Sequence, residues 1–189
     1  MAEPMRTLAG LDMVGGNAAL DLANTINSRR VPEHDYLRTS DDLRAWAERA
    51  GLPSRAPVLD SAEGAQQVRS AHRLREAIYR TFSAIAAGSP PPATDLRRVL
   101  RAYGAAVSRA SLGPSGQLEW PSPSAPLDPV AFAAGQLLIA HDRPPVKECP
   151  GCGWLFLDRS RNGSRRWCDM QTCGSRDKMR RYYRSRRGA

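Results

Sequence analysis

The chain has 189 residues, of which 41% are hydrophobic and 6% aromatic, and its formal net charge at pH 7 is +9. This length suits one sizeable domain and a second, small one. No apolar run reaches the roughly 18 residues that a membrane span needs, and residues 1–14 lack the charged-then-apolar layout of a signal peptide. We therefore expect a cytoplasmic protein with no membrane association.

The first part of the chain is predicted to be mainly helical, because apolar residues recur there at helical spacing. Asn17, Ser40 and Thr94 are the predicted N-caps, and Asp128-Pro129 opens the last helix. A short β-hairpin is expected between residues 108–112 and 117–120, and residues 121–126 form a Pro-rich linker or loop. The expected helices span residues 17–28, 40–50, 61–87, 94–107 and 128–140.

A polar stripe on the first predicted helix is a candidate ligand site. Asp21, Asn24 and Asn27 are spaced at i, i+3 and i+6, beside the apolar face. Such a stripe can bind a small molecule, and the alternative is that its side chains cap a neighbouring loop or helix end. We take the capping role as the default.

Catalytic motifs are missing from the sequence. It contains no GxGxxG, no Walker-type phosphate loop, no HExxH and no GxSxG. The three histidines, His34, His72 and His141, have no motif-like relation to one another. We therefore expect a protein that is not an enzyme, with His72 as a half-buried structural residue.

All four cysteines lie in one C-terminal segment. They form the pairs Cys149-x2-Cys152 and Cys168-x4-Cys173, with fifteen residues between the pairs. Two such pairs can complete a tetrahedral site of four thiolates, which suits Zn²⁺ and a reducing cytosol. Two local disulfides, free thiols or an iron–sulfur cluster are the alternatives. We predict one zinc ion per chain, held by all four cysteines.

The residues around the cysteines predict a treble-clef-like finger. The apolar run 154–157 and Trp167 read as two short strands that pair around a turn at residues 161–164. The segment from Cys173 to about Arg184 reads as a helix, with Thr172 available as its N-cap. Because such a unit has little core, the metal would supply much of its folding free energy.

The positive charge is concentrated in this finger. Residues 143–189 contain 13 Lys or Arg and four Asp or Glu, whereas residues 1–142 contain 15 of each. Eleven of the 13 are Arg, which suits phosphate and guanine contacts. A solvated charged face is the alternative, and we favour nucleic-acid binding. The candidate residues are Arg159, Arg161, Arg165, Arg166, Arg176, Lys178, Arg180, Arg181, Arg184, Arg186 and Arg187.

Two stretches resemble known families. The segment CGWLFLDRSRNGSRRWCDMQTCGSRDK resembles the CGNR zinc finger of bacterial transcription regulators, whose naming tetrapeptide appears as Cys173-Gly174-Ser175-Arg176, with Ser175 in the Asn place. Residues 15–25, GGNAALDLANT, are similar to the GGxxALDFVNT-like opening of the ABATE domain, which usually precedes this finger. The resemblance implies a bacterial, stress-induced regulator of transcription.

The sequence thus predicts a mainly α protein with a small β-hairpin element (α+β) and a C-terminal treble-clef-like zinc finger. Residues 1–142 form an ABATE-like sensing or assembly domain and residues 143–189 the four-cysteine finger. The predicted function is transcription regulation: the finger contacts duplex DNA, and the first domain senses a small-molecule effector, forms a homodimer, or both. The alternative is an RNA- or ribosome-associated zinc-binding module, because Tyr182 and Tyr183 lie in the basic tail.

Overall fold

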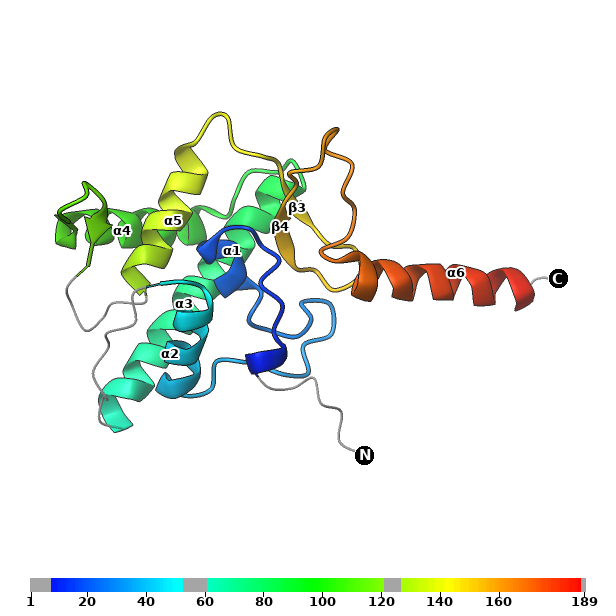
Figure 1. The fold of residues 1–189 in the computed structure, drawn as a ribbon, viewed down its shortest axis with the longest axis horizontal. Coiled ribbons are helices and arrows are strands. Elements are labelled where there is room, and N and C mark those ends of the chain that lie inside the picture. The colour runs from blue at the N-terminus through cyan, green and yellow to red at the C-terminus, as the bar shows by residue number, and fades with distance from the viewer. Residues whose placement is uncertain (1–7, 53–60, 121–126, 188–189) are drawn as a thin grey trace.

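The computed structural model describes residues 8–52, 61–120 and 127–187, and it is mainly helical with two small antiparallel hairpins (Figure 1). The predicted fold class is confirmed. The predicted linker at residues 121–126 lies outside the described residues. None of the helices within the described ranges is long and apolar enough to cross a membrane.

The longest helix, α3, lies at the centre of the helical part, in contact with α1, α2, α4 and α5. Its buried face carries Ala71, Leu74, Ile78 and Phe82 at helical spacing, as predicted. The helices of this part are η1 (Leu8–Gly10), α1 (Ala18–Ala23), α2 (Ser40–Arg49), α3 (Ser61–Ala86), α4 (Ala93–Arg109) and α5 (Leu127–Ile139).

Two of the predicted N-caps are displaced. Helix α2 is capped by Thr39 instead of Ser40, because Thr39 and Asp42 form a reciprocal capping box. Helix α4 follows Pro92, which makes no side-chain cap bond, so the predicted cap Thr94 lies inside the helix. Asn17 does cap α1, since its side chain accepts a hydrogen bond from Ala19 N at 2.9 Å.

Helix α1 is much shorter than the predicted range of residues 17–28. It ends at Ala23, and Ile26 forms an isolated antiparallel bridge with Asp35. The side chain of Asn24 is bonded to a backbone segment 131 residues away. These distant partners favour an extended chain after Asn24, and helical periodicity alone does not reveal them.

The hairpin predicted after α4 is present but short. It pairs β1 (Ser111–Leu112) with β2 (Leu118–Glu119). The finger contains a second hairpin, in which β3 (Val146–Glu148) pairs with β4 (Leu155–Leu157). The prediction that the 154–157 strand pairs with the segment around Trp167 is therefore wrong.

A tight turn at residues 149–153, which we call the knuckle, lies between β3 and β4. Cys149 N donates to Trp154 O at 2.8 Å, and Gly153 N donates to Cys149 O at 2.8 Å, which reverses the chain within a few residues. Gly153 has a φ of +77°, a conformation that favours glycine. A Cβ at this position would also lie 2.7 Å from Arg29 Cβ.

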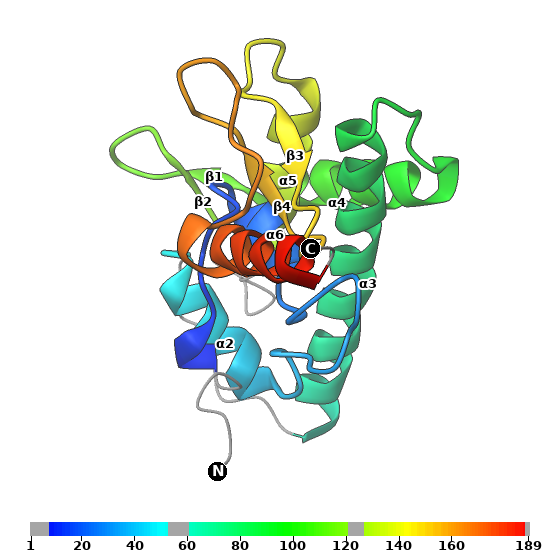
Figure 2. The same cartoon turned by 90° about the vertical axis from the view of Figure 1, so that its right-hand side faces the viewer.

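A basic helix ends the described chain. A π-helical turn, η2 (Met170–Gly174), leads into α6 (Ser175–Arg187). The N-cap of this turn is Asp169, whose carboxylate accepts from Thr172 N at 2.8 Å, so the prediction of Thr172 as the cap is wrong. Helix α6 projects away from the body of the molecule in Figure 1 and is viewed nearly end-on in Figure 2.

The finger and the helical part share one hydrophobic core. A single cluster of buried residues includes Leu20, Ile78 and Phe82 from the helices and Leu155 and Phe156 from β4. Strand β4 contacts α1 and α3, and β3 contacts α3. The finger is therefore built into the fold and is not attached through a free linker.

Candidate metal centre and nucleic-acid interface

The four cysteines form one buried cluster, as the sequence predicts. Their Sγ atoms all lie within 4.8 Å of one another, and Cys152 Sγ is 3.5 Å from Cys168 Sγ. Tetrahedral Zn²⁺ with Zn–S bonds of about 2.3 Å places its sulfur ligands about 3.8 Å apart. All four cysteines are free, and a disulfide would need an S–S distance of about 2.05 Å. The donor set fits one Zn²⁺.

The charge balance of the cluster also favours a cation. Hydrogen bonds with neighbouring thiols, above all Cys152, lower the pKa of the Cys149 thiol. Hydrogen bonding to Cys149 raises the pKa of Cys168. The pKa of Cys173 is lowered as well, whereas that of Cys152 is raised, so the cluster alone does not favour the charged form of all four thiols. A bound divalent cation removes this conflict because it deprotonates the coordinating thiols.

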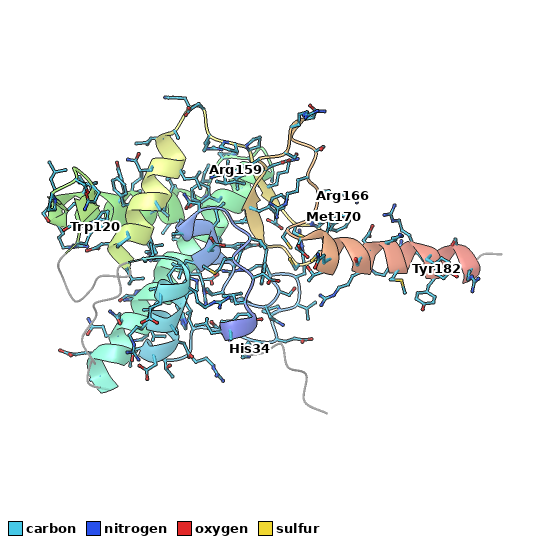
Figure 3. All side chains as sticks on the ribbon, viewed as in Figure 1. His34, Trp120, Arg159, Arg166, Met170 and Tyr182 are labelled. Carbon is cyan, nitrogen blue, oxygen red and sulfur yellow. The ribbon has the colours of Figure 1, made fainter. Side chains whose placement is uncertain are left out.

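The predicted nucleic-acid residues are mostly exposed and lie on two parts of the finger. Arg159, Arg161 and Arg166 belong to the loop after β4, and the others except Arg165 to α6 (Figure 3). Every residue of this set from Arg176 to Arg186 is exposed, and Arg181 pairs with Asp177 at 3.0 Å. Their contact with nucleic acid remains a prediction.

Arg165 differs from the rest of this set. It is half-buried, its Nε donates to Trp167 O at 3.0 Å, and its guanidinium lies 4.4 Å from the centroid of the Phe156 ring. Its Nη2 donates to Cys168 O. Arg165 therefore holds the loop beside the second cysteine pair, a role that counting basic residues does not reveal.

Asn24 joins the helical part to the finger. Its Nδ2 donates to Leu155 O at 2.9 Å, and its Oδ1 accepts from Leu155 N at 2.9 Å. Two residues after Leu155 in β4, Leu157 N donates to Gly15 O at 3.0 Å. One edge of β4 thus pairs with β3, and the other is covered by Asn24 and Gly15.

The knuckle is bonded to the segment that follows α1. Cys152 O accepts from Arg29 N at 2.7 Å, and Trp154 Nε1 donates to Ile26 O at 2.7 Å. At the edge of this contact, Arg30 pairs with Glu148 at 2.6 Å. We call the contacts of Gly15, Asn24, Ile26, Arg29 and Arg30 with the finger the seam.

The comparisons with known proteins agree with this two-part architecture. Residues 16–141 match the ABATE family, described as "Putative stress-induced transcription regulator". The chain belongs to the ABATE family. Residues 146–187 match the CGNR zinc finger, so both resemblances hold, in the predicted order. No curated protein matches the sequence.

The opening motif of the ABATE domain is used for internal contacts. Asp21 Oδ1 accepts from Gly15 N at 2.8 Å, and a Cβ at Gly15 would lie 2.9 Å from Asp21 N. Asn24 bonds the finger, and Asn27 Oδ1 accepts from the backbone N–H groups of Glu33 and His34. All three residues of the polar stripe thus make structural contacts, in agreement with the default interpretation of the stripe.

Of this stripe, Asn27 also borders a cavity of about 210 Å³ between the helical part and the finger. Three cysteines of the cluster, Cys152, Cys168 and Cys173, line this cavity. The rest of its lining includes Asp12 and Tyr36 of the helical part and Thr172 and Arg176 of the finger. Asp21 and Asn24 do not line it. The sequence therefore predicts one member of a candidate ligand site and misses the others, which come from separate segments.

Burial of Asp21 in the ABATE domain makes stability depend on pH. Burial raises the pKa of this carboxyl from 3.8 to about 6, although the bond from Gly15 N opposes the shift. Because the folded protein then binds more protons than the unfolded chain, the free energy of unfolding should fall as pH rises from about 4 to 6. We expect Asp21→Asn to reduce this pH-dependent decrease in the free energy of unfolding by about 2–3 kcal/mol.

Urea unfolding between pH 4 and pH 7 measures this effect. Asp41→Asn is the control, because it makes the same chemical change at a side chain that is 80% exposed. If the free energy of unfolding had the same pH dependence in wild type and Asp21→Asn, Asp21 would not be the source of the effect.

Proposed function

We propose that this ABATE protein is a bacterial transcription regulator that acts in the cytoplasm and binds duplex DNA through its zinc finger. The family matches support a regulator with a zinc finger. The observation that carries DNA binding is the position of α6, a basic helix that stands clear of the body (Figure 1). The proposal assigns the chain no catalytic activity.

The dimensions and charge of α6 suit a nucleic-acid groove. Its 13 residues contain seven Lys or Arg and one Asp, and its length is about 20 Å. The DNA major groove is about 12 Å wide and admits a single α-helix. Because Cys173 lies in η2, immediately before α6, a metal bound there would fix the direction in which α6 projects.

We expect the arginines of α6 to neutralise phosphates. Arg180→Ala, Arg181→Ala and Arg184→Ala should each weaken binding to all DNA sequences and reduce the slope of log affinity against log salt by about 0.9. The measurement is a salt titration of duplex binding by fluorescence anisotropy. Arg101→Ala is the control, because Arg101 is exposed on α4 of the ABATE domain.

The same salt titration distinguishes an arginine that neutralises a phosphate from one that reads bases. A large loss on one sequence with an unchanged slope would mean that the residue reads bases and does not neutralise a phosphate. An equal change in slope for Arg101→Ala would argue against α6 as the binding element.

For the ABATE domain we propose a regulatory role, through an effector, a homodimer, or both. The cavity beside Asn27 is the candidate effector site, because its lining comes from both the helical part and the finger. A ligand there regulates only if it binds the DNA-competent and incompetent states with different affinity. A homodimer would present two fingers to one palindromic site.

A metabolite screen by thermal shift on the zinc-loaded full chain tests the effector. Hits that leave DNA affinity unchanged would contradict sensing, and a monomeric mass in light scattering on DNA would contradict the dimer. Selection of bound DNA from a random pool tests the main proposal, with folded RNA as competitor at matched salt. Stronger binding to RNA would favour the alternative of an RNA-associated module.

A further inference from the structure

One surface of α6 combines arginines with exposed apolar side chains. A groove of about 710 Å³ lies in the angle between the knuckle and α6. Gly151 and Cys173 border it at the knuckle end, and Arg176, Met179, Arg180 and Tyr183 border it along the helix. It is therefore an apolar floor with two arginines at its rim.

Helical geometry places these side chains together and separates them from their neighbours. Arg176 and Arg180, and likewise Met179 and Tyr183, are four residues apart, so each pair is adjacent on one side of α6. Lys178, Arg181 and Tyr182 are not part of the groove lining. At 100° per residue, Lys178 and Arg181 lie on the opposite side of the helix, and Tyr182 lies on its flank, 100° from Tyr183.

The two tyrosine rings contact each other edge-on, with centroids 5.7 Å apart, but their other surroundings differ. Arg186 lies over the Tyr182 ring, 4.9 Å from its centroid. Tyr183 is 57% exposed and Met179 51% exposed, although both are large apolar side chains. Among the described helices and strands α6 contacts only η2, so no other element within the described ranges covers this floor.

We propose that the groove binds an unpaired base of single-stranded DNA, with the base on Tyr183 and Met179 and its flanking phosphates on Arg176 and Arg180. This inference rests on the proposed contact of the finger with DNA and adds a single-strand site to it. Aromatic platforms flanked by cations are the usual means of holding single strands, because every base has a flat π-face.

Charge complementarity selects this occupant. The arginine rim attracts an anionic partner, and a second copy of the chain would bring its own basic α6 against it. Bases in a duplex are stacked on one another, so only their edges are open to a protein. An unpaired base is the occupant that offers both an apolar face for the floor and phosphates for the rim.

The test compares two adjacent tyrosines in the zinc-loaded full chain. Anisotropy is measured with a labelled 12-base single-stranded oligodeoxynucleotide and with its duplex, at matched salt. Tyr183→Leu should weaken single-strand binding on the order of tenfold and change duplex binding less than twofold. Tyr182→Leu is the matched control, because Tyr182 is 48% exposed but lies outside the groove.

Two further variants keep the test decisive. Tyr183→Phe retains the ring and should retain binding, whereas Met179→Ser should weaken single-strand binding alone. Zinc content and melting temperature confirm that each variant is folded.

Each contrary outcome leads to a different conclusion. Equal losses for Tyr182→Leu and Tyr183→Leu would overturn the groove as the site. Duplex binding without single-strand binding would overturn the inference and leave the proposed function intact, whereas no binding of either DNA would overturn both. Tighter binding of the same sequence as RNA would overturn the choice of DNA. A dimer that Tyr183→Leu dissociates would assign the groove to a second copy of the chain.

Discussion

Replacement of Cys168 by Ser is expected to abolish zinc binding and to destabilise the whole chain. Apparent binding free energies of structural zinc sites are about 10–16 kcal/mol, and this energy is folding energy. Because Leu155 and Phe156 of the finger belong to the same hydrophobic core as Ile78 and Phe82, loss of the finger exposes part of the ABATE core. Metal analysis should return one zinc per wild-type chain, and calorimetry should show a lower melting temperature for Cys168→Ser.

A surface substitution provides the control for this experiment. Leu112→Ser in β1 alters a side chain that is 75% exposed, and it should keep both the zinc and the melting temperature. If Cys168→Ser melted the finger while an unshifted ABATE transition persisted, the shared core would not couple the two parts. Visible charge-transfer absorbance in the purified protein would instead indicate an iron–sulfur cluster.

The second large effect is expected at the seam. Asn24→Ala removes the partners of both Leu155 N and Leu155 O, which lie in the buried strand β4. A buried polar group left without a partner costs about 1–3 kcal/mol, so we expect a loss of about 2–6 kcal/mol. Zinc affinity should fall as well, because the metal and the seam stabilise the same folded finger. Chemical unfolding of the zinc-saturated protein and a competition titration with a zinc chelator measure the two effects.

Asn27→Ala is the matched control for Asn24→Ala. It removes the same side chain from the same segment, but Asn27 is half-buried and bonds only the local loop at Glu33 and His34. We expect a smaller loss of stability and no change in zinc affinity. Equal effects of the two substitutions would mean that the seam has no special role.

The metal centre could be predicted from the sequence because its ligands are set by local geometry. Cys149 and Cys152 lie in one tight turn, and Cys168 and Cys173 flank another, so spacing alone identifies the chemistry. The buried face of α3 could also be predicted from the sequence, since its helical periodicity continues for several turns. The concentration of charge in α6 also required no knowledge of tertiary structure.

Features that depend on distant partners could not be predicted in this way. Helical periodicity continues past Ala23, but Asn24 is held by Leu155, and no local pattern encodes that pairing. The strand partner of β4 lies before the knuckle, where Val146 and Glu148 offer a run too short to be recognised as a strand. Thr172 and Asp169 are both good caps, and only the observed bond identifies Asp169.

The seam also imposes an order on biosynthesis. Gly15 and Asn24 leave the ribosome 142 and 131 residues ahead of their partners Leu157 and Leu155. At about 5–20 residues per second, the interval is roughly 7–30 s. During this interval the ABATE helices have an uncovered apolar face. That face stays uncovered until the cysteines bind metal and the finger folds. Zinc supply should therefore set how much newly made protein escapes proteases, a quantity that pulse labelling in zinc-limited cells would reveal.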